Sequence, residues 1–332
     1  MPIRVAHFGL GPIGAAIVRQ VAARKGFKVA AAIDIDPAKV GRDLGAVVSL
    51  SRKLGVKVQA DAAKTLRAAK PDVVVLCTSS SLKKVLPQID VILKARIPIV
   101  STTEELSYPA ANRVRLGRQI DAMAKKAKVA VLGTGVNPGF VMDALPIALT
   151  GVCERVDSIE IHRVQDARIR RLPFQQKIGA GLTREEFQKR VDAGTVRHVG
   201  LTESITMIAD AFGWRLDRIT DEIAPKVAEK RVSSEFLTVE PGFVCGIVQD
   251  GVGFRGGDAI IRLHMEAYLG APESYDSTTI EGSPRLAMKI AGGVHGDIAT
   301  ASIVVNSIPK IIRAAPGLRT MRDLALPSYF GG

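Results

Sequence analysis

The sequence lacks the features that mark secreted, membrane-spanning and zinc-binding proteins. Its 332 residues include only three cysteines, Cys77, Cys153 and Cys245, which lie far apart and show no CxxC spacing. They therefore suggest neither a disulfide framework nor a zinc site. No apolar run reaches the roughly 18 residues of a membrane span, and the N-terminal "MPIRVAHFG" enters a strand pattern rather than a signal peptide. We expect a cytoplasmic protein with no membrane partner.

Several catalytic signatures are also missing. The sequence contains no H-E-x-x-H, no G-x-S-x-G and no Y-x-x-x-K motif, so zinc proteases, serine hydrolases and short-chain dehydrogenases lack their defining residues. The five histidines show no ligand spacing. We therefore expect no metal site.

Charge is the one unusual bulk property. Lys and Arg number 46 against 33 Asp and Glu, a formal net charge of +13. The basic residues are scattered over helix patterns, without a recognised binding module or an aromatic-interleaved stripe, so we expect no nucleic-acid partner. A phosphorylated cofactor accounts for part of the charge. At 47% hydrophobic and 24% charged residues, the composition is that of a globular chain long enough for two domains.

The first 135 residues alternate apolar strands with helix-period segments. The strands are "IRVAHF", "KVAAAI", "PDVVVLCTSS", "IPIVSTT" and "VAVLGTG", and helical patterns such as "IGAAIVRQVAARKG" and "SLKKVLPQIDVILKA" separate them. This order predicts a doubly wound parallel sheet. Ligands of such sheets gather beyond the carboxyl ends of the strands, so the loops after each strand are the candidate sites.

A glycine-rich loop follows the first strand. "GLGPIG" places Gly9, Gly11 and Gly14 in the G-x-G-x-x-G register of dinucleotide-binding proteins: a tight turn, close approach to a pyrophosphate, and close helix packing. Asp34 closes the second strand 20 residues later, where the ribose-binding acid is expected. Asp34 favours NAD, whereas Arg42 could meet the 2'-phosphate of NADP. The cofactor is therefore NAD or NADP.

Two further loops carry polar groups. Thr78 to Ser81 lie at the end of the "PDVVVLCTSS" strand and offer hydroxyls and a helix cap beside the cofactor. Glu104 and Glu105 follow "IPIVSTT" at the next strand end. Acids in a first helical turn complement the helix dipole, whereas a carboxylate at a strand end could also be catalytic.

From about Phe140 the pattern changes. "SIEIHRV", "EFLTVEPGFVCGIVQDGVGF", "DAIIRLHMEAYL" and "STTIEGSPRLAMKI" predict the longer strands of a mostly antiparallel sheet, with a capping box from Thr183 to Glu186 opening a helix between them. "GDIATASIVVNSIPKII" predicts a C-terminal helix interrupted by Pro309. We expect a dinucleotide-binding domain over 1–139, an α+β substrate and dimerisation domain over 140–295, and a helix in 296–332 that returns to the first domain.

Several ordered segments together resemble the 2,4-diaminopentanoate dehydrogenases and the related native amine dehydrogenases. They are "GLGPIG", "DIDPAKVGRDLG", "STTEELSYP", "LGTGVNPGFVMDALP", "RVQDARIRRLPFQQKIGAG" and "TASIVVNSIPKIIRAAPGLRTMRDL". The resemblance implies a Rossmann domain, a homodimer built through the second-domain sheet, and NAD(P)-linked oxidative deamination of an amine. The reaction reverses as reductive amination of a ketone with ammonia. Dihydrodipicolinate reductases share the N-terminal fold, but their paired-histidine signature has no counterpart here.

The resemblance also assigns residues. The family's catalytic glutamate corresponds to Glu104, with Glu105 as a chiefly structural neighbour. The other expected substrate contacts are Glu105, Phe140, Asp166, Arg170, Arg171 and Thr300. The expected cofactor contacts are Gly9, Gly11, Pro12, Ile13, Gly14, Asp34, Arg42, Thr78, Ser79, Ser80, Thr103, Asn137 and Asn306.

Alternatives remain for the second half and for the activity. Asp166 with Arg170 and Arg171 could bind a substrate carboxylate or ammonium, or could form an interdomain or dimer salt-bridge network. The runner-up activity is an imine or dihydrodipicolinate-type reductase. A non-catalytic dinucleotide sensor is the alternative from another class. The physiological amine is not evident from these residues.

Overall fold

A computed structural model describes residues 1–332 and divides them into two compact units. Unit 1 comprises Met1–Phe140 together with His295–Gly332, and unit 2 comprises Val141–Val294. The C-terminal segment thus completes the unit that the N-terminus begins. No helix is both long and apolar enough to cross a bilayer.

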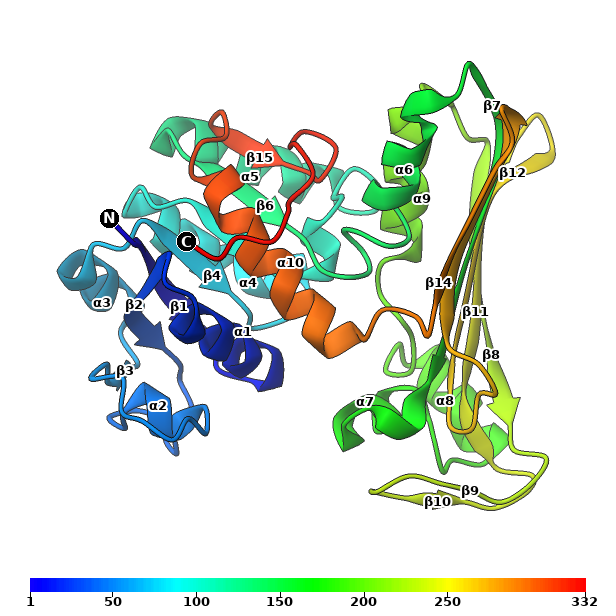
Figure 1. Ribbon diagram of the computed structural model, residues 1–332, viewed down its shortest axis with the longest axis horizontal. Helices are drawn as coiled ribbons and strands as arrows, with labels where there is room; N and C mark the ends of the chain where they lie inside the picture. The colour runs from blue at the N-terminus through cyan, green and yellow to red at the C-terminus, as the bar shows by residue number, and fades with distance from the viewer. The chain divides into compact units, whose positions relative to one another are not determined.

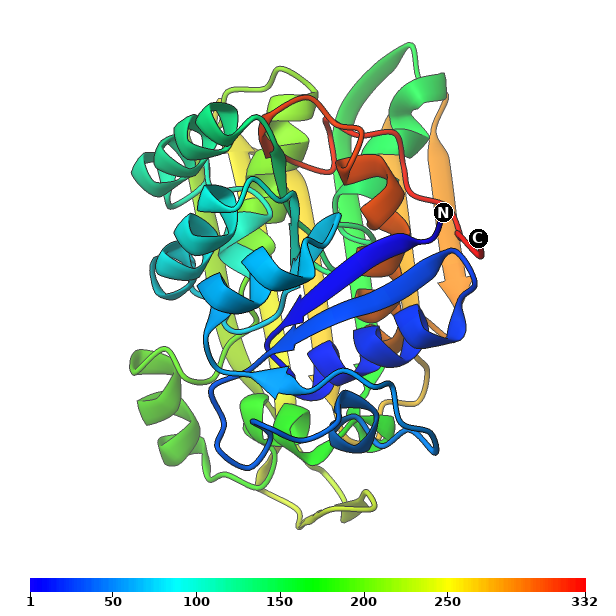
Figure 2. The same cartoon turned by 90° about the vertical axis from the view of Figure 1, so that its left-hand side faces the viewer.

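Unit 1 is a seven-stranded parallel sheet with helices on both faces (Figures 1 and 2). Its strands lie in the order β15-β6-β5-β4-β1-β2-β3, and every neighbouring pair is parallel. The strands are β1 (Ile3–Phe8), β2 (Phe27–Ile33), β3 (Val58–Gln59), β4 (Val73–Leu76), β5 (Ile99–Ser101), β6 (Ala130–Gly133) and β15 (Gly317–Arg319). The order reverses after β1, which confirms the doubly wound prediction.

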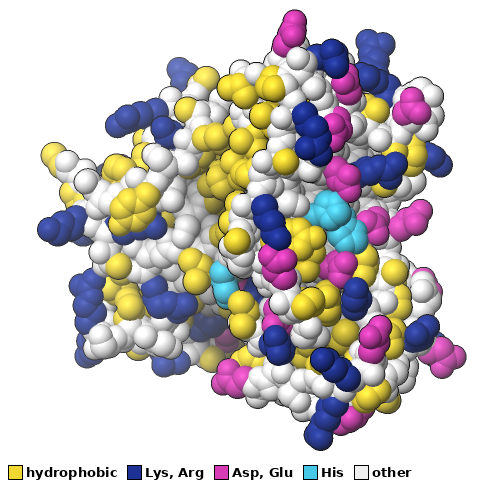
Figure 3. All heavy atoms as spheres, turned by 45° about the vertical axis from the view of Figure 1, so that its right-hand side comes forward, with side chains coloured by type: hydrophobic (Ala, Val, Ile, Leu, Met, Phe, Trp, Pro, Cys, Tyr) yellow, Lys and Arg dark blue, Asp and Glu magenta, His cyan; other side chains and the backbone are white.

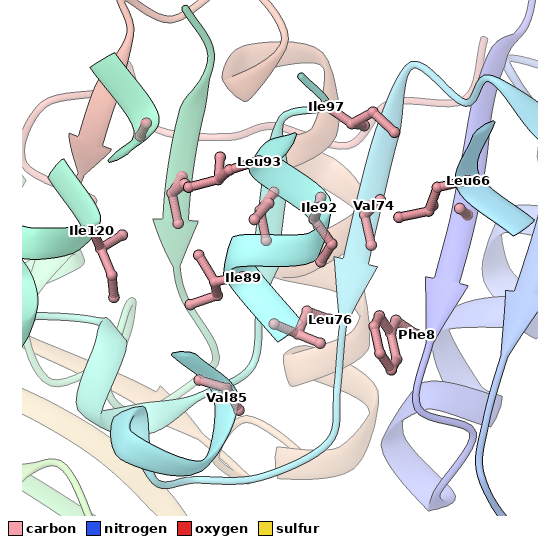
Figure 4. Packing of buried hydrophobic residues seen from close by; sticks show 14 of the residues in the cluster. Phe8, Leu66, Val74, Leu76, Val85, Ile89, Ile92, Leu93, Ile97 and Ile120 are labelled. Atoms are coloured by element: carbon pink, nitrogen blue, oxygen red, sulfur yellow. The ribbon is translucent and has the colours of Figure 1, made fainter. Parts of the chain in front are cut away.

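The helices of unit 1 form two layers on this sheet. They are α1 (Pro12–Ala23), α2 (Leu44–Val47), α3 (Ala62–Ala69), α4 (Leu82–Lys94), the 3-10 turn η1 (Glu104–Leu106), α5 (Val114–Ala127) and α10 (Gly296–Ile311). The layer of α3, α4 and α5 packs on a core that includes Phe8, Val74, Leu76 and Ile89 (Figure 4). Helix α10 packs beside α1 and against β5 and β6. It continues through Pro309, so the expected interruption there is wrong: the proline lies in its last turn.

Unit 2 is a six-stranded sheet in the order β14-β13-β7-β12-β11-β8. Neighbours are antiparallel except β7 and β12, which confirms the mostly antiparallel prediction. The strands are β7 (Arg155–Asp166), β8 (Arg218–Val227), β11 (Val244–Arg255), β12 (Asp258–Tyr268), β13 (Tyr275–Ser283) and β14 (Leu286–Ala291), with a separate hairpin of β9 (Val232–Ser233) and β10 (Thr238–Val239).

The helices of unit 2 gather on one side of its sheet (Figure 1). They are α6 (Ala144–Leu149), η2 (Thr150–Val152), η3 (Ala167–Ile169), α7 (Leu172–Lys177), α8 (Arg184–Asp192) and α9 (Leu201–Ala211). Helix α9 packs on β8, β11 and β12. Helix α8 starts with the predicted capping box, in which Glu186 N–H donates to Thr183 Oγ1 and Thr183 N–H donates to the Glu186 carboxylate.

Candidate functional site

The glycine-rich loop connects β1 to α1 at the carboxyl edge of the unit 1 sheet. Gly9 has φ +92°, and a Cβ there would lie 2.4 Å from the Cys77 carbonyl oxygen. A Cβ at Gly14 would lie 2.1 Å from the Gly9 carbonyl oxygen. These two glycines are therefore required by the fold itself, because no side chain fits.

Gly11 differs from its neighbours, because a Cβ built on it meets nothing within 4 Å. It is the N-cap of α1, where no side chain caps the helix, and Pro12 occupies the first turn. No side chain therefore occupies the backbone N–H groups of that turn, which lie at the positive end of a 12-residue helix. Open space and uncapped donors are what a pyrophosphate requires, so the loop fits a dinucleotide.

Asp34 is fixed against this loop. Its Oδ2 accepts the Leu10 N–H at 2.8 Å and its Oδ1 accepts the Asp36 N–H at 3.0 Å. Arg42, the expected partner of a 2'-phosphate, donates instead to the Ala38 carbonyl at 3.1 Å and is exposed. The cation beside Asp34 is Lys39, 3.5 Å from Oδ2, which the sequence analysis missed.

The loops after β4 and β5 are tied together by side chains. Thr103 Oγ1 donates to the Ser79 carbonyl at 2.8 Å and accepts from Ser101 Oγ at 3.0 Å. The Glu105 N–H donates to the Ser80 carbonyl, and the Thr78 hydroxyl donates to Gln88. The expected hydroxyl cap of α4 does not form: Ser81 is its N-cap but makes no side-chain hydrogen bond.

Glu105 supplies that cap. Its Oε2 accepts the Leu82 N–H at 2.7 Å, and its Oε1 accepts from Arg113 Nη2 at 2.8 Å. The Glu105 side chain is 15% exposed. Both carboxylate oxygens are therefore engaged in holding α4 and the start of α5.

Glu104 lies beside Glu105 but makes none of these contacts. Its carboxylate has no hydrogen-bond partner within the protein, while its backbone carbonyl accepts from Ser107. Burial raises the pKa of the Cys77 thiol to about 12; hydrogen bonds with Thr102 oppose this shift and the nearby Glu104 charge adds to it. Because Cys77 also contacts Gly9, Glu104 lies near the carboxyl end of β4 and the glycine-rich loop.

The loop after β6 folds back on itself within unit 1. The Asn137–Pro138 peptide is cis, and Gly139 has φ +127°. The Val136 N–H donates to Thr300 Oγ1 of α10 at 3.4 Å, so Thr300 holds this loop. Phe140, half-buried, ends the first stretch of unit 1.

Asn306 lies near the amino ends of the unit 1 strands, opposite to the carboxyl ends where the glycine-rich loop lies. Its Oδ1 accepts from Arg24 Nη1 at 2.6 Å and from the Phe330 N–H at 3.2 Å. Arg24 follows the C-terminal end of α1, whereas the glycine-rich loop is at its start. The expectation that Asn306 binds the cofactor is therefore not supported, since α10 runs from Thr300 to Asn306 away from the loop.

In unit 2, the Asp166 side chain binds groups of the loops next to it. It caps η3 by accepting from the Arg168 N–H, pairs with the Arg168 guanidinium, and accepts the Gly270 N–H at 3.1 Å. Arg170 is buried, donates to Gln165 Oε1 at 2.9 Å and stacks on Phe174. Asp166 therefore does not form a single anion- or ammonium-binding group with Arg170 and Arg171. Arg171 is the N-cap of α7.

A group of basic side chains converges on His198 in the same unit. Burial, together with the charges of nearby cations, lowers the pKa of His198 to about 3. These cations are Lys177, Arg163, Arg197 and Arg170. Asp276 pairs with Arg163 and Asp221 pairs with Arg197. The His198 Nδ1 is buried with no hydrogen-bond partner.

No group of three or more His, Cys, Asp and Glu side chains is placed to hold a metal ion.

Two family models cover most of the sequence. The 2,4-diaminopentanoate dehydrogenase C-terminal domain matches residues 140–332, and the N-terminus of dihydrodipicolinate reductase matches residues 3–116. The 2,4-diaminopentanoate dehydrogenase of Acetoanaerobium sticklandii is 40% identical over 267 residues, 79% of this chain and 76% of that protein.

The chain belongs to the 2,4-diaminopentanoate dehydrogenase family. It is accordingly an oxidoreductase. An amine dehydrogenase of Streptomyces virginiae is 24% identical over 348 residues, covering 98% of this chain and 96% of that protein. The solved amine dehydrogenase of Mycobacterium smegmatis superposes with a TM-score of 0.88 at 26% identity, covering 100% of this chain and 98% of that one.

A more distant structure supports the fold alone. Dihydrodipicolinate reductase from Paenisporosarcina sp. TG-14 gives a TM-score of 0.53 at 16% identity, over 96% of this chain and 98% of that one. The resemblance in the sequence to the 2,4-diaminopentanoate dehydrogenase family is therefore confirmed at the level of family and fold.

Proposed function

We propose that this family member is an NAD(P)-dependent amine dehydrogenase. It would deaminate an amine oxidatively to a ketone and ammonia, and would aminate the ketone in reverse. The observation that carries the proposal is Glu104, a carboxylate without a hydrogen-bond partner near the loop that fits a dinucleotide. A bound nicotinamide would supply the hydride acceptor.

The residues that would hold the dinucleotide all belong to unit 1. The uncapped first turn of α1, with Gly11, Pro12 and Ile13, would face the pyrophosphate, and Asp34 would accept the ribose hydroxyls. Thr78, Ser79 and Ser80 in the β4 loop and Asn137 in the β6 loop lie at the same edge of the sheet. Thr103 would act through Ser79, whose carbonyl it holds.

Glu104 has the chemistry that deamination requires. A substrate ammonium must lose a proton before hydride leaves its carbon, and a carboxylate can accept that proton. Transfer of the hydride from that carbon to the dinucleotide leaves a cationic iminium, which a nearby negative charge stabilises. Water then adds to the iminium carbon, and ammonia leaves to give the ketone. Because no protein donor occupies the Glu104 carboxylate, its lone pairs are available for both tasks.

The substrate class that fits best is an amine that also carries a carboxylate, such as 2,4-diaminopentanoate. Support comes from the 2,4-diaminopentanoate dehydrogenase that is 40% identical to this chain, because the substrate in its name carries both an amine and a carboxylate. A guanidinium or ammonium group can bind such a carboxylate through charge-assisted hydrogen bonds.

Coupled nicotinamide absorbance tests the proposal. Purified protein is assayed with NAD+ and with NADP+ against 2,4-diaminopentanoate, other diamino acids, simple amines and amino acids, and in reverse with ketones and ammonia. Turnover of a carboxylated amine that Glu104→Gln abolishes is the expected result. Turnover only with a preformed cyclic imine would favour the reductase alternative. Tight cofactor binding with no turnover across the panel would favour the sensor.

We also propose a homodimer formed through the uncovered face of the unit 2 sheet, its outer face. This face carries both signs of charge, with Glu160, Asp250 and Glu266 beside Arg262 and Lys226, and His162 and His264 rings 5.0 Å apart (Figure 3). Val248 and Val252 on β11 flank Asp250 there, so two half-buried valines lie among the charges. A mixed, partly apolar surface suits a two-fold symmetric contact with a second copy.

The compartment we propose is the cytoplasm. An amine dehydrogenase draws on the pool of nicotinamide dinucleotide and on ammonia. The three cysteines are free thiols, which suits a reducing compartment.

A further inference from the structure

The turn after β2 contains a lysine held between two acids. Lys39 Nζ lies 3.1 Å from Asp36 Oδ2 and 3.5 Å from Asp34 Oδ2. The Lys39 side chain is 27% exposed and that of Asp34 is 12% exposed, so this contact is partly shielded from water. Burial alone would lower the pKa of the Lys39 ammonium, but the two carboxylates outweigh it and raise the pKa. Lys39 therefore stays a cation at this position.

The backbone places Lys39 there. The Asp36 side chain accepts the Ala38 N–H at 2.9 Å, and the Asp36 carbonyl accepts the Lys39 N–H at 2.9 Å. This tight turn brings the lysine back over the end of β2. Asp34 is itself fixed by the N–H groups of Leu10 and Asp36. The three side chains thus form a defined arrangement directly beside the glycine-rich loop.

The charges at this point decide which dinucleotide can bind. Asp34 and Asp36 with Lys39 sum to one net negative charge. The ribose hydroxyls of NAD can donate to Asp34. A 2'-phosphate carries about −1.5 to −2 charge and two nearby carboxylates would repel it unless a cation can turn toward it. Lys39 is a flexible point charge that can leave Asp36 for a phosphate, whereas Arg42 is engaged with the Ala38 carbonyl.

We propose that Lys39 is the residue that admits the 2'-phosphate of NADP, and that Asp36 opposes it by competing for the same ammonium. The inference rests on the proposed dinucleotide site and adds the determinant of its cofactor preference. With NAD, Lys39 stays between the two acids. With NADP, it moves from Asp36 to the phosphate. The site therefore accepts both dinucleotides, and the balance between Lys39 and Asp36 sets the preference.

Direct binding tests this without turnover. The Kd values of NADH and NADPH are measured by cofactor fluorescence on the full-length protein, and those of 5'-AMP and adenosine 2',5'-bisphosphate by calorimetry. Lys39→Ala should weaken the binding of NADPH and the bisphosphate about tenfold or more, the scale of a charge-assisted contact. It should change the Kd values of NADH and 5'-AMP by less than about threefold. Lys39→Arg should retain most of the NADPH affinity.

Two further variants separate Lys39 from its surroundings. Asp36→Asn keeps the oxygen that accepts the Ala38 N–H but loses the charge, and should strengthen NADPH binding several-fold. Arg42→Ala tests the competing cation: if Lys39 is the determinant, Arg42→Ala should weaken NADPH binding far less than Lys39→Ala does. If Lys39→Ala lowers the melting temperature, Lys39→Gln replaces it, since it keeps most of the side chain.

Three results would overturn the inference. The first is an equal loss of affinity for NADH and NADPH in Lys39→Ala. The second is a selective loss of NADPH affinity in Arg42→Ala instead, and the third is a wild-type protein that binds NADH but not NADPH. A wild-type protein that binds neither dinucleotide would refute the proposed function itself, and this inference with it. Failure of the inference alone is thus distinguishable from failure of the proposed function.

Discussion

The Glu105 carboxylate accepts the Leu82 N–H at 2.7 Å and so caps a helix that begins 23 residues earlier in the chain. Its second oxygen binds Arg113 at 2.8 Å. Glu104, the preceding residue, has no such partner. Two adjacent residues with the same side chain therefore differ in role: Glu105 holds the loops together, and the Glu104 carboxylate remains available at the strand ends.

Exchanging each acid for its amide should separate these roles. Glu104→Gln should keep the fold and the cofactor affinity while lowering turnover about a hundredfold or more, the scale for removing an acid/base group. Glu105→Gln weakens the charge-assisted bonds to Leu82 and Arg113 and should cost about 1 to 2 kcal/mol of stability. Turnover and melting temperature are measured for both. A fully active Glu104→Gln enzyme would contradict the mechanism but not the dinucleotide site.

Gly11→Val should weaken cofactor binding without unfolding the protein. A Cβ at this position meets nothing in the protein, so the cost to stability is small, but a branched side chain would occupy the space beside the first turn of α1. We expect at least a tenfold weaker Kd for NADH and NADPH. Gly151→Val is the matched control, since its Cβ also meets nothing and it lies in unit 2. Unchanged affinity in a folded Gly11→Val protein would refute the placement.

The homodimer predicts a specific monomeric variant. Val248→Glu with Val252→Glu adds two charges to the outer face of the unit 2 sheet, where Asp250 and Glu266 already lie. Like charges and lost apolar area should dissociate the dimer, as measured by sedimentation or light scattering. Val152→Glu is the control, because Val152 is a 72% exposed apolar residue on η2. A wild-type protein that is monomeric at micromolar concentration would contradict the dimer.

Local signals predicted the parts of the structure that depend on near neighbours. The glycine register and Asp34 lie within one strand-helix-strand unit, and the capping box of Thr183 and Glu186 spans one helical turn, so their spacing was sufficient. Strand β8 was missed because charged residues and Pro225 interrupt its apolar pattern, and β3 and β15 because two or three residues carry no periodicity.

Long-range partners could not be predicted in this way. Glu105 caps α4 only because β4 and β5 are neighbours in the sheet, and Lys39 reaches Asp34 only through the turn at Asp36. Asn306 was misplaced for a related reason. Asn306 lies on the same helix as Thr300. It is six residues later, about one and two-thirds helical turns, and this distance places it toward the amino ends of the strands, where Arg24 binds it.

A buried histidine gives the last prediction, which concerns stability against pH. His7 lies in β1 at 1% exposure, and both ring nitrogens lack a hydrogen-bond partner. Burial lowers the pKa of His7 from 6.5 to about 3. Above pH 6.5 the ring is neutral in both the folded and the unfolded chain, so it contributes no pH dependence. As the pH falls from 6.5 toward 3, only the unfolded chain takes up the proton, and the free energy of unfolding decreases by up to about 1.4 kcal/mol per pH unit.

His7→Leu should remove this slope, because leucine does not titrate, and should leave stability at pH 8 equal or higher, because two unpaired buried nitrogens are lost. Amide hydrogen exchange of β1 between pH 8 and pH 4.5 reports the free energy of opening for unit 1 directly. Val5→Ala, two residues earlier on the same face of β1, is the control: it should destabilise unit 1 by a similar amount at every pH, since it leaves only a small cavity. If the His7→Leu protein loses stability toward pH 4.5 as steeply as the wild type, His7 is protonated in the folded chain and the assigned pKa is wrong.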